Sequence, residues 1–343
     1  MIAKTSLAQA AMHILHAADD AFQHTASAME QLALGLGYAH SDVGKVWQWL
    51  EHELGRQTEQ GFIPQVHDAQ VCTPPFHSIL AWTCWKKDPS SARIEKLFDA
   101  LLQSHHYWYL HRDPQEMGLP CVHFAEEAVM PEFFRNYNAP FQIQDPAFLG
   151  LLCRANECLI EMGEKLQRDL SDLIQWHELT VFGLNEDLWD DASKSYCGFD
   201  LLSGQKLNIP NLANYLPLWA GVPDQELAEE MCRNLIKRYF QDAYWALPMQ
   251  LLTKGSSGET VSLLLNRMIY AGLLRYGFKE NASYLRKSSL QMVGNYGFYN
   301  LYQALMHPHD NIGIGKGNSA VTAALVIDLA NGIPEKRGFE QNW

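Results

Sequence analysis

Apolar residues recur at spacings of three and four along most of the chain, which is the pattern of helices that bury one face. The pattern is clear in residues 6–22 and in the segment that follows Asp145 and Pro146. Aspartate caps helix N-termini well, and proline suits the first turn because its missing N–H needs no partner there. We therefore predict a helix in each segment. The predicted buried faces are Leu7, Ala11, Ile14, Ala18 and Phe22, and Phe148, Leu152, Ala155, Leu159, Met162 and Leu166.

Two further helices are predicted towards the end of the sequence. Residues 256–259, Ser-Ser-Gly-Glu, have the spacing of a capping box and predict the start of a helix that ends at Gly277. Its buried face would be Val261, Leu265, Met268 and Leu274. A second helix is predicted from its cap, Ser319, to a point near Gly332. Segments that alternate polar and apolar residues are almost absent, so strands are expected only as short pieces, such as around residues 198–208.

The predicted helices follow one another without a low-complexity linker or a shift in composition that would mark a domain boundary. Helix pairs recur roughly every 45–55 residues, judged from the apolar stripes and the helix-breaking residues between them. This layout is typical of a toroid of helical hairpins. We therefore predict an all-α fold, an (α/α)6 toroid of helical hairpins, with residues 1–343 forming a single domain.

Composition excludes several classes of function. Hydrophobic residues make up 47% of the chain, enough for a large core, and the net charge of −13 argues against nucleic-acid and anionic-membrane partners, because both bind basic surfaces. The sequence has no run of 18 apolar residues and no signal-peptide pattern, so we expect no membrane partner and a cytoplasmic location. The seven cysteines form no C-x-x-C pair, which favours reduced thiols over disulfides or a zinc site.

Two segments have the composition of ligand sites without the required pattern. His307, His309 and Asp310 contain metal-binding groups, but Pro308 keeps the two histidines off a common helical face. A nucleotide-binding glycine loop follows a strand, whereas the glycine-rich residues 313–317 follow no predicted strand. We therefore predict no metal site and no cofactor.

Short aromatic and glycine-containing motifs occur in a characteristic order. The C-terminal third contains Tyr244-Trp245, then Gly-Phe-Tyr-Asn at 297–300, a Gly-x-Gly turn at 313–315, and Thr-Ala-Ala-Leu at 322–325. This order resembles the closing segment of a helical-barrel glycosidase superfamily that includes trehalases, processing α-glucosidases and mannosylglycerate hydrolases. Earlier segments match in the same order, so that the resemblance covers roughly residues 45–330. They are 61–64, 73–77, 111–119, 141–146 and 188–200.

The resemblance implies inverting glycoside hydrolysis, in which one carboxyl protonates the leaving oxygen and another activates a water on the opposite face of the sugar. The family's base is the Glu of Gly-Phe-Tyr-Glu, and here that position is Asn300. Asparagine can hydrogen-bond a water but cannot take its proton. The family's acid is an Asp, and Pro131 falls at its position, while Glu127 matches a nearby family Glu. Both catalytic carboxylate positions are therefore altered.

Other carboxyls are candidates for these roles. Glu127 or Glu132 would be the acid, because neighbouring carboxylates raise one another's pKa, and Asp242 or Asp310 would be the base. Asn300 would position the water or the sugar. The further candidates for contact with substrate are Phe76, His77, Arg112, His123, Glu126, Trp189, Tyr244 and Trp245, and we expect Tyr244 and Trp245 to lie over the same central pocket as Phe76, His77, His123 and Trp189.

Three functions remain open. The first is a carbohydrate-active enzyme that resembles inverting glycoside hydrolases and acts on a small glycoside or sugar derivative. The second is a catalytically silent relative that binds a sugar or a partner protein. The third is a sugar isomerase or epimerase, with His123 or His77 as the proton carrier. The expected ligand is a small carbohydrate, and a homo-oligomer that covers an open edge of the toroid is a further possibility.

Overall fold

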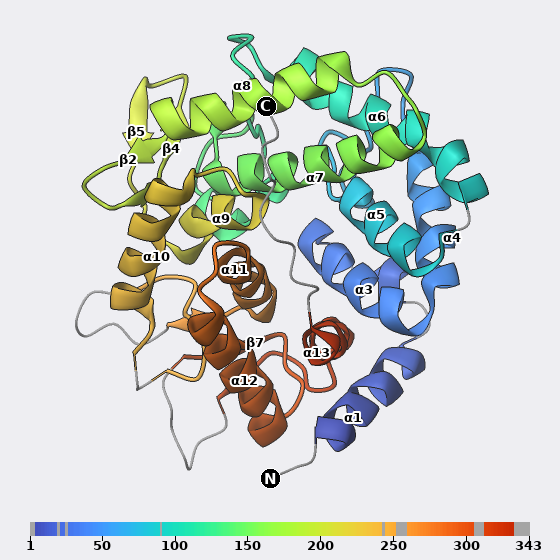
Figure 1. The fold of residues 1–343 in the computed structure, drawn as a ribbon, viewed down its shortest axis with the longest axis vertical. Coiled ribbons are helices and arrows are strands. Elements are labelled where there is room, and N and C mark those ends of the chain that lie inside the picture. Colours follow the sequence, from blue (N-terminus) through green and yellow to red (C-terminus); the bar gives the residue numbers. More distant parts are fainter. Residues whose placement is uncertain are drawn as a thin grey trace.

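The computed structural model describes residues 4–18, 21–24, 27–89, 91–241, 244–251, 259–304 and 312–332. Two concentric sets of helices dominate it, and the predicted all-α toroid is confirmed (Figure 1). The inner helices are α3 (Ala28–Ser41), α5 (His77–Lys87), α7 (Pro146–Lys165), α9 (Pro217–Ala220), α11 (Leu263–Arg275) and α13 (Ala320–Asn331). The outer helices are α1 (Lys4–Ala17), α4 (Val43–Leu54), α6 (Ser91–Arg112), α8 (Ser171–Asp187), α10 (Gln225–Tyr239) and α12 (Lys279–Tyr296), and the short α2 (Ala21–His24) follows α1.

The inner helices form a closed ring. Each packs on the next in chain order, and α13 packs against α3 to complete the circle, with α1 covering α13 from outside. The approach of α3 to α13 is close because Gly37 has no side chain: a Cβ at this position would lie 2.4 Å from Cα of Ala324. The ring therefore depends on a contact between segments that are far apart in the sequence.

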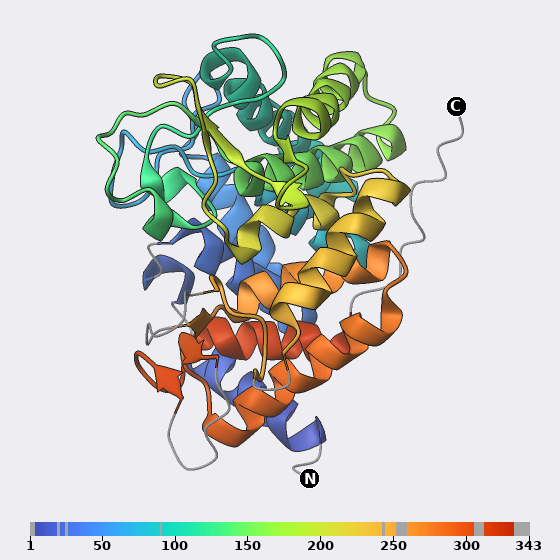
Figure 2. The same ribbon diagram turned by 90° about the vertical axis from the view of Figure 1, so that its left-hand side faces the viewer.

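The strands are short and lie in the connections that lead into the inner helices. β1 (Ile143–Gln144), β4 (Gly198–Asp200) and β5 (Gln205–Leu207) form one antiparallel sheet, which confirms the strands expected around 198–208. β2 (Trp189–Asp190) pairs with β3 (Ser195–Tyr196), and β6 (Thr260–Val261), β7 (Leu301–Gln303) and β8 (Gly313–Ile314) form a third sheet. Figure 2 shows the long connections gathered on one side of the ring. We call this side, where the inner helices begin, the loop end.

Helix boundaries agree with the sequence where a cap decides them. The Asp145 side chain accepts hydrogen bonds from the N–H groups of Ala147 and Phe148 and starts α7, and Ser319 caps α13 through the N–H of Thr322. The helix predicted over 6–22 is interrupted: α1 ends at Ala17, and Phe22 lies on α2.

The predicted helix start at 256–259 is wrong. Residues 256–258 lie outside the described residues, but Thr260 and Val261 pair with β7 in a sheet. The helix begins at Leu263, after Ser262 caps the N–H of Leu265. Pairing of the strand with residues about 40 positions further along the chain thus overrides the local capping signal.

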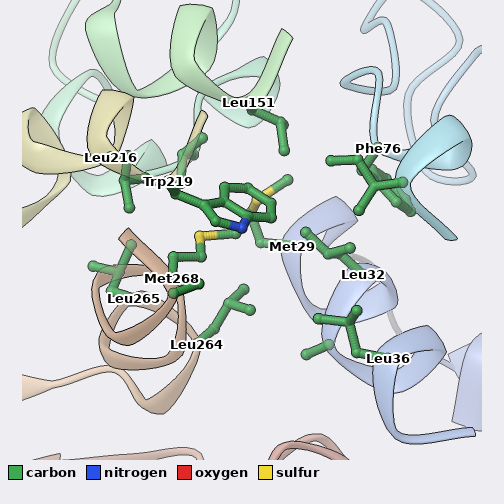
Figure 3. Close-up of a cluster of buried hydrophobic side chains, with 14 of the residues drawn as sticks. Met29, Leu32, Leu36, Phe76, Leu151, Leu216, Trp219, Leu264, Leu265 and Met268 are labelled. Atoms are coloured by element: carbon green, nitrogen blue, oxygen red, sulfur yellow. The ribbon is translucent and has the colours of Figure 1, made fainter. Parts of the chain in front are cut away.

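Apolar side chains fill the middle of the ring. Figure 3 shows Trp219 of α9 at the centre of a buried cluster, with Met29 and Leu32 of α3 on one side and Met268 of α11 on another. All four are at least 90% buried. Burial of each such side chain stabilises the fold by about 1.5–3 kcal/mol, so this cluster is a principal source of the ring's stability. All seven cysteines are also buried, and each is a free thiol.

None of the helices that the structure describes combines the length and the apolar character needed to cross a lipid bilayer.

We expect Gly37→Ala to destabilise the protein by about 1–3 kcal/mol, because the new methyl group collides with the backbone of α13 and either helix must move. Gly294→Ala is the matched control: Gly294 is also helical, and a Cβ there meets only Leu7 at 3.9 Å. The control should be neutral or stabilising by up to about 1 kcal/mol, since alanine favours helix. Urea denaturation measures both, and equal stability of the two variants would contradict the close packing of α3 on α13.

Candidate functional site

Glu127 joins three segments of the loop end. It lies in the short 3-10 turn η1 (Ala125–Glu127), and its side chain is completely buried. Its Oε1 accepts hydrogen bonds from the N–H of Cys72 at 3.0 Å and from Nη2 of Arg112 at 2.8 Å. Its Oε2 accepts from the N–H groups of His123 at 2.7 Å and Phe124 at 3.3 Å. The carboxylate thereby holds the end of α6 and the connections before α5 and α7 in one arrangement.

This bonding argues against a reactive role for Glu127. Burial raises the pKa of Glu127, and Arg112 with the three backbone N–H donors opposes that rise. A general acid needs a proton that can reach the leaving oxygen, yet both carboxylate oxygens of Glu127 already accept two hydrogen bonds each. Arg112 is buried as well, and its Nη1 has no partner among the described residues. The geometry therefore makes Glu127 a positioning residue for the loop end.

The other sequence-predicted carboxyls differ from Glu127 in their surroundings. Glu126 and Glu132 are both exposed on the connection before α7; Glu132 belongs to a second 3-10 turn, η2 (Pro131–Phe133). Asp242 and Asp310 lie outside the described residues, so the structure gives no geometry for either candidate base. The residue at the acid position of the resembling family, Pro131, begins η2.

Phe76 and His77 form an aromatic stack with Trp49 of α4. The ring centroids of Phe76 and His77 are 4.6 Å apart, and those of Trp49 and His77 are 5.7 Å apart. Burial, with a smaller contribution from Arg56, lowers the pKa of His77 to about 3, and neither ring nitrogen has a hydrogen-bond partner among the described residues. His77 is therefore a neutral, buried ring at physiological pH.

His123 and Trp189 occupy separate parts of the loop end. His123 is half-buried beside Glu127, and burial together with Arg112 lowers its pKa to about 4. Trp189 of β2 contacts the buried Tyr196 of β3 with centroids 5.4 Å apart. The two residues are thus held by different connections.

Tyr244, Trp245 and Asn300 lie near the third sheet. The N–H of Trp245 donates to the carbonyl of Ala304, and its ring contacts Tyr296, the last residue of outer helix α12, at 6.0 Å. Burial and Glu259 raise the pKa of Tyr244 to about 12. Asn300 is exposed immediately before β7. The described contacts of Trp245 are thus with the residue after β7 and with the end of α12, and those of Phe76 and His77 are with the interior.

A small cavity opens beside the N-terminus of α7. It has a volume of about 20 Å3, enough for about one water, and Asp145, Asn211 and Asn214 line it together with Met130 and Phe134. Asp145 is 5% exposed, and burial raises its pKa from 3.8 to about 6, although the N–H groups that it caps oppose the rise. A carboxyl with this pKa in a cavity can give up or take a proton near neutral pH.

The sequence indicates Asp145 only as a helix cap, and it does not single out Asn211 or Asn214. Asp145 stands in the Gln-Asp-Pro segment that carries part of the family resemblance, so the sequence could have indicated it as a site residue. The burial that raises its pKa cannot be read from the sequence. Asn211 caps the 3-10 turn η3 (Leu212–Tyr215), and its side chain donates to the carbonyl of Ile209. Nothing in the local pattern of 209–214 distinguishes this loop from others.

Among the residues that the structure describes, no three His, Cys, Asp or Glu side chains lie close enough together to hold a metal ion. The segment His307-Pro308-His309-Asp310 lies outside those residues.

Comparisons with known proteins identify the family to which this sequence is similar. Residues 33–249 match the family model described as "Mannosylglycerate hydrolase MGH1-like glycoside hydrolase domain". A mannosylglycerate hydrolase of Thermus thermophilus is 30% identical over 324 residues, which cover 76% of this chain and 76% of the relative. Another, from Rubrobacter radiotolerans, is 22% identical and covers 86% of this chain and 88% of its own length.

Solved structures show the same fold. A GH63 mannosylglycerate hydrolase from Thermus thermophilus, in complex with glucose, superposes with a TM-score of 0.81 over 94% of this chain and 99% of its own, at 23% identity. A neutral trehalase from Saccharomyces cerevisiae superposes with a TM-score of 0.68 over 88% of this chain and 70% of its own, at 12% identity. The helical toroid is thus shared with both groups of enzymes.

Proposed function

The chain belongs to the mannosylglycerate hydrolase MGH1-like glycoside hydrolase family, and from that premise we propose that it hydrolyses a small glycoside in which a hexose is joined to a short carboxylic acid. The observation that carries the proposal is the family match over residues 33–249, which includes the contacts of Glu127 and the Asp145 cavity. Relatives that match most of the chain are named mannosylglycerate hydrolases, which supports mannosylglycerate as the substrate to test first.

We propose Asp145 as the general acid. Inverting hydrolysis requires a group that gives a proton to the oxygen of the leaving acid while water attacks the anomeric carbon from the opposite face. Among the described carboxyls at the loop end, Asp145 combines a pKa of about 6 with a place on a cavity. Glu132 is the alternative acid, because it is exposed on the connection whose Phe133 and Phe134 line the same cavity. Entry of a sugar requires this connection to move.

Asp242 or Asp310 remains our proposal for the base that takes a proton from the attacking water. Asn300 would hold that water or a ring hydroxyl through its amide. Arg112 is proposed to meet the carboxylate of the substrate, since its Nη1 has no partner among the described residues. The remaining proposed substrate contacts come from the aromatic and polar side chains of the loop end. They are Phe76, His77, His123, Glu126, Trp189, Tyr244 and Trp245.

A specific observation favours a second function, binding of the glycoside without turnover. Asn300 and Pro131 occupy the positions at which the resemblance places the base and the acid, and neither side chain can transfer a proton. A protein that kept the pocket and lost both groups would bind the sugar and release it unchanged.

We also propose that the ring is one domain and that the protein works in the cytoplasm. The closure of α3 on α13 supports the first point, because it unites both ends of the helical series. The seven free, buried thiols support the second, because a reducing compartment keeps cysteines in that state.

Hydrolysis assays on the wild type and Asn300→Glu distinguish the two functions. The expected result is that wild type releases sugar from mannosylglycerate. If the protein only binds mannosylglycerate, calorimetry detects binding and no sugar is released. Asn300→Glu should then cleave a mannosyl fluoride roughly tenfold or more faster than wild type. Fluoride leaves without the help of an acid, and the new glutamate supplies the base. Asn295→Glu, at another exposed asparagine, is the control and should leave both rates unchanged. A wild type that neither binds nor cleaves mannosylglycerate or simple mannosides overturns the proposal.

A further inference from the structure

A second and larger cavity lies at the opposite end of the ring, where the inner helices finish. Its volume is about 380 Å3, and residues of all six inner helices line it. Lys86 and Lys87 are the last residues of α5, and His40 and Asp328 stand in the last turns of α3 and α13. The small Asp145 cavity is instead at the start of α7. The larger cavity borders the apolar cluster of Figure 3, because Trp219 at the centre of that cluster also lines the cavity.

The lining of the larger cavity is rich in positive charge. Lys86, Lys87, Arg154 and Arg267 contribute four cationic side chains, whereas Asp328 is the carboxylate among the lining residues. The protein as a whole has a net charge of −13, so the charge of this cavity is opposite in sign to that of the whole chain. Like charges held this close repel one another, and an anion placed among them relieves the repulsion.

Asp328 is already fully engaged. Its Oδ2 accepts from Nε of Arg267 at 2.8 Å and its Oδ1 lies 3.1 Å from Nε2 of His40. Nζ of Lys87 lies 3.1 Å from Nδ1 of His40, so Nδ1 accepts a hydrogen bond from Lys87 and the N–H at Nε2 donates one to Asp328. Burial alone would raise the pKa of Asp328, but Arg267 and His40 hold it below the ordinary value. This relay orients Arg267 and Lys87 and leaves Lys86 and Arg154 without neutralisation by Asp328.

The carboxylate nearest to Arg154 is shared. Glu157, one turn further along α7, pairs with Nη1 of Arg154 at 2.6 Å and also with Arg275, so two guanidinium groups divide one negative charge. Lys86 has no hydrogen bond or ion pair within the described parts of the chain; its Nζ lies over the ring of Trp82 at 5.4 Å from the centroid. Part of the Lys86 side chain is exposed, yet the protein around it removes enough water to lower its pKa. Cys158 opposes that decrease, and Arg154, Arg267 and Lys87 add to it.

We propose that this cavity binds the phosphate group of a small phosphorylated molecule. Arginine presents a planar fork of donors that matches phosphate oxygens, and lysine adds a mobile positive charge, so two residues of each type suit a dianion better than a single carboxylate. The cavity also lies within the roughly 300–1,000 Å3 range of small-molecule sites, larger than a bare phosphate requires. A hexose phosphate fills the remaining volume, and inorganic phosphate shares its chemistry.

Calorimetric titration of the full chain tests the site, with total ionic strength held constant by sodium chloride because salt screens such contacts. The probes are inorganic phosphate, glucose 6-phosphate and glucose. Both phosphates should bind and glucose should not, with glucose 6-phosphate the tighter of the two if the sugar is recognised. Equal affinity of the two phosphates would identify free phosphate as the ligand. Because the site is separate from Asp145, phosphate binding should persist in Asp145→Asn, and failure of glycoside hydrolysis leaves this result unaffected.

Lys86→Gln and Lys87→Gln should each weaken phosphate binding roughly tenfold, the loss expected for one charge-assisted hydrogen bond. Both side chains are exposed at the end of α5, so folding should be retained, and circular dichroism checks it. Lys237→Gln removes an exposed lysine of outer helix α10 and should leave the affinity unchanged. Absence of phosphate binding to wild type, or an equal loss in Lys237→Gln, would show that the cavity is not an anion site.

Discussion

Replacement of Glu127 with glutamine should lower the free energy of unfolding by about 3–5 kcal/mol, the largest stability effect that we expect from a single change at the loop end. The substitution leaves the buried guanidinium of Arg112 without its counter-charge and turns an amide N–H2 towards donors that need an acceptor. At least one of the N–H groups of Cys72 and His123 then loses its partner beside a side chain that is completely buried. Urea denaturation at pH 7 measures the loss.

Glu126→Gln is the matched control, because it makes the same chemical change one residue earlier on an exposed side chain. Its stability should stay within about 0.5 kcal/mol of wild type. If Glu127 were the general acid instead of a positioning residue, Glu127→Gln would keep its stability and lose only activity. A stable, inactive Glu127→Gln would therefore reverse our assignment of Glu127 and Asp145.

Asp145→Asn should have the opposite signature: a more stable protein with at least a hundredfold lower rate of glycoside hydrolysis. Asparagine caps helices about as well as aspartate, so α7 keeps its start. The folded-state pKa of about 6 is above the ordinary 3.8, so the contribution of this group to stability is full below pH 4 and is lost as the pH rises to about 6. The pKa of Asp145 is about two units higher in the folded protein than in the unfolded chain, which corresponds to about 3 kcal/mol of unfolding free energy.

The measurement is the difference in unfolding free energy between wild type and Asp145→Asn from pH 4 to pH 7. With rising pH the variant should become more stable relative to wild type, by about 2–3 kcal/mol in all. The other titrating groups are the same in both proteins, so their contributions cancel in the difference. Asp224→Asn provides the comparison, because Asp224 caps α10 through the N–H of Leu227 but is exposed. That variant measures the effect of removing the carboxylate from an exposed helix cap. A flat difference for Asp145→Asn, or full activity, would contradict the proposed role of Asp145.

Local signals in the sequence predicted those elements that local chemistry decides. Asp145 with Pro146, and Ser319 with Gly332, define α7 and α13 because caps act within one turn. The start of α11 was missed because Thr260 pairs with Gln303, a contact that no local pattern reports. The recurring helix pairs indicated a toroid of helical hairpins, and the resemblance to helical-barrel glycosidases supported the same fold.

The site was harder to predict because its chemistry depends on what surrounds each carboxyl. The sequence shows Glu126, Glu127 and Glu132 as equivalent acidic residues, yet only Glu127 receives four hydrogen bonds among the described residues. Burial, which the sequence does not state, separates Asp145 from exposed helix caps such as Asp224. The cations of the larger cavity come from α5, α7 and α11, which are separated in the sequence and line one cavity only in the folded ring.

The closure of α3 on α13 also sets an order on folding during synthesis. The contact between His40 and Asp328 can form only after Asp328, 288 positions later in the chain, has been synthesised. Until the ribosome has released α13, the apolar faces of α3 and α1 that it covers have no permanent neighbour, and contacts of such long range form slowly. The nascent chain is thus an open arc for most of its translation. The single helix that turns the arc into a ring also carries the carboxylate that orients Arg267, so closure and completion of the larger cavity are one event.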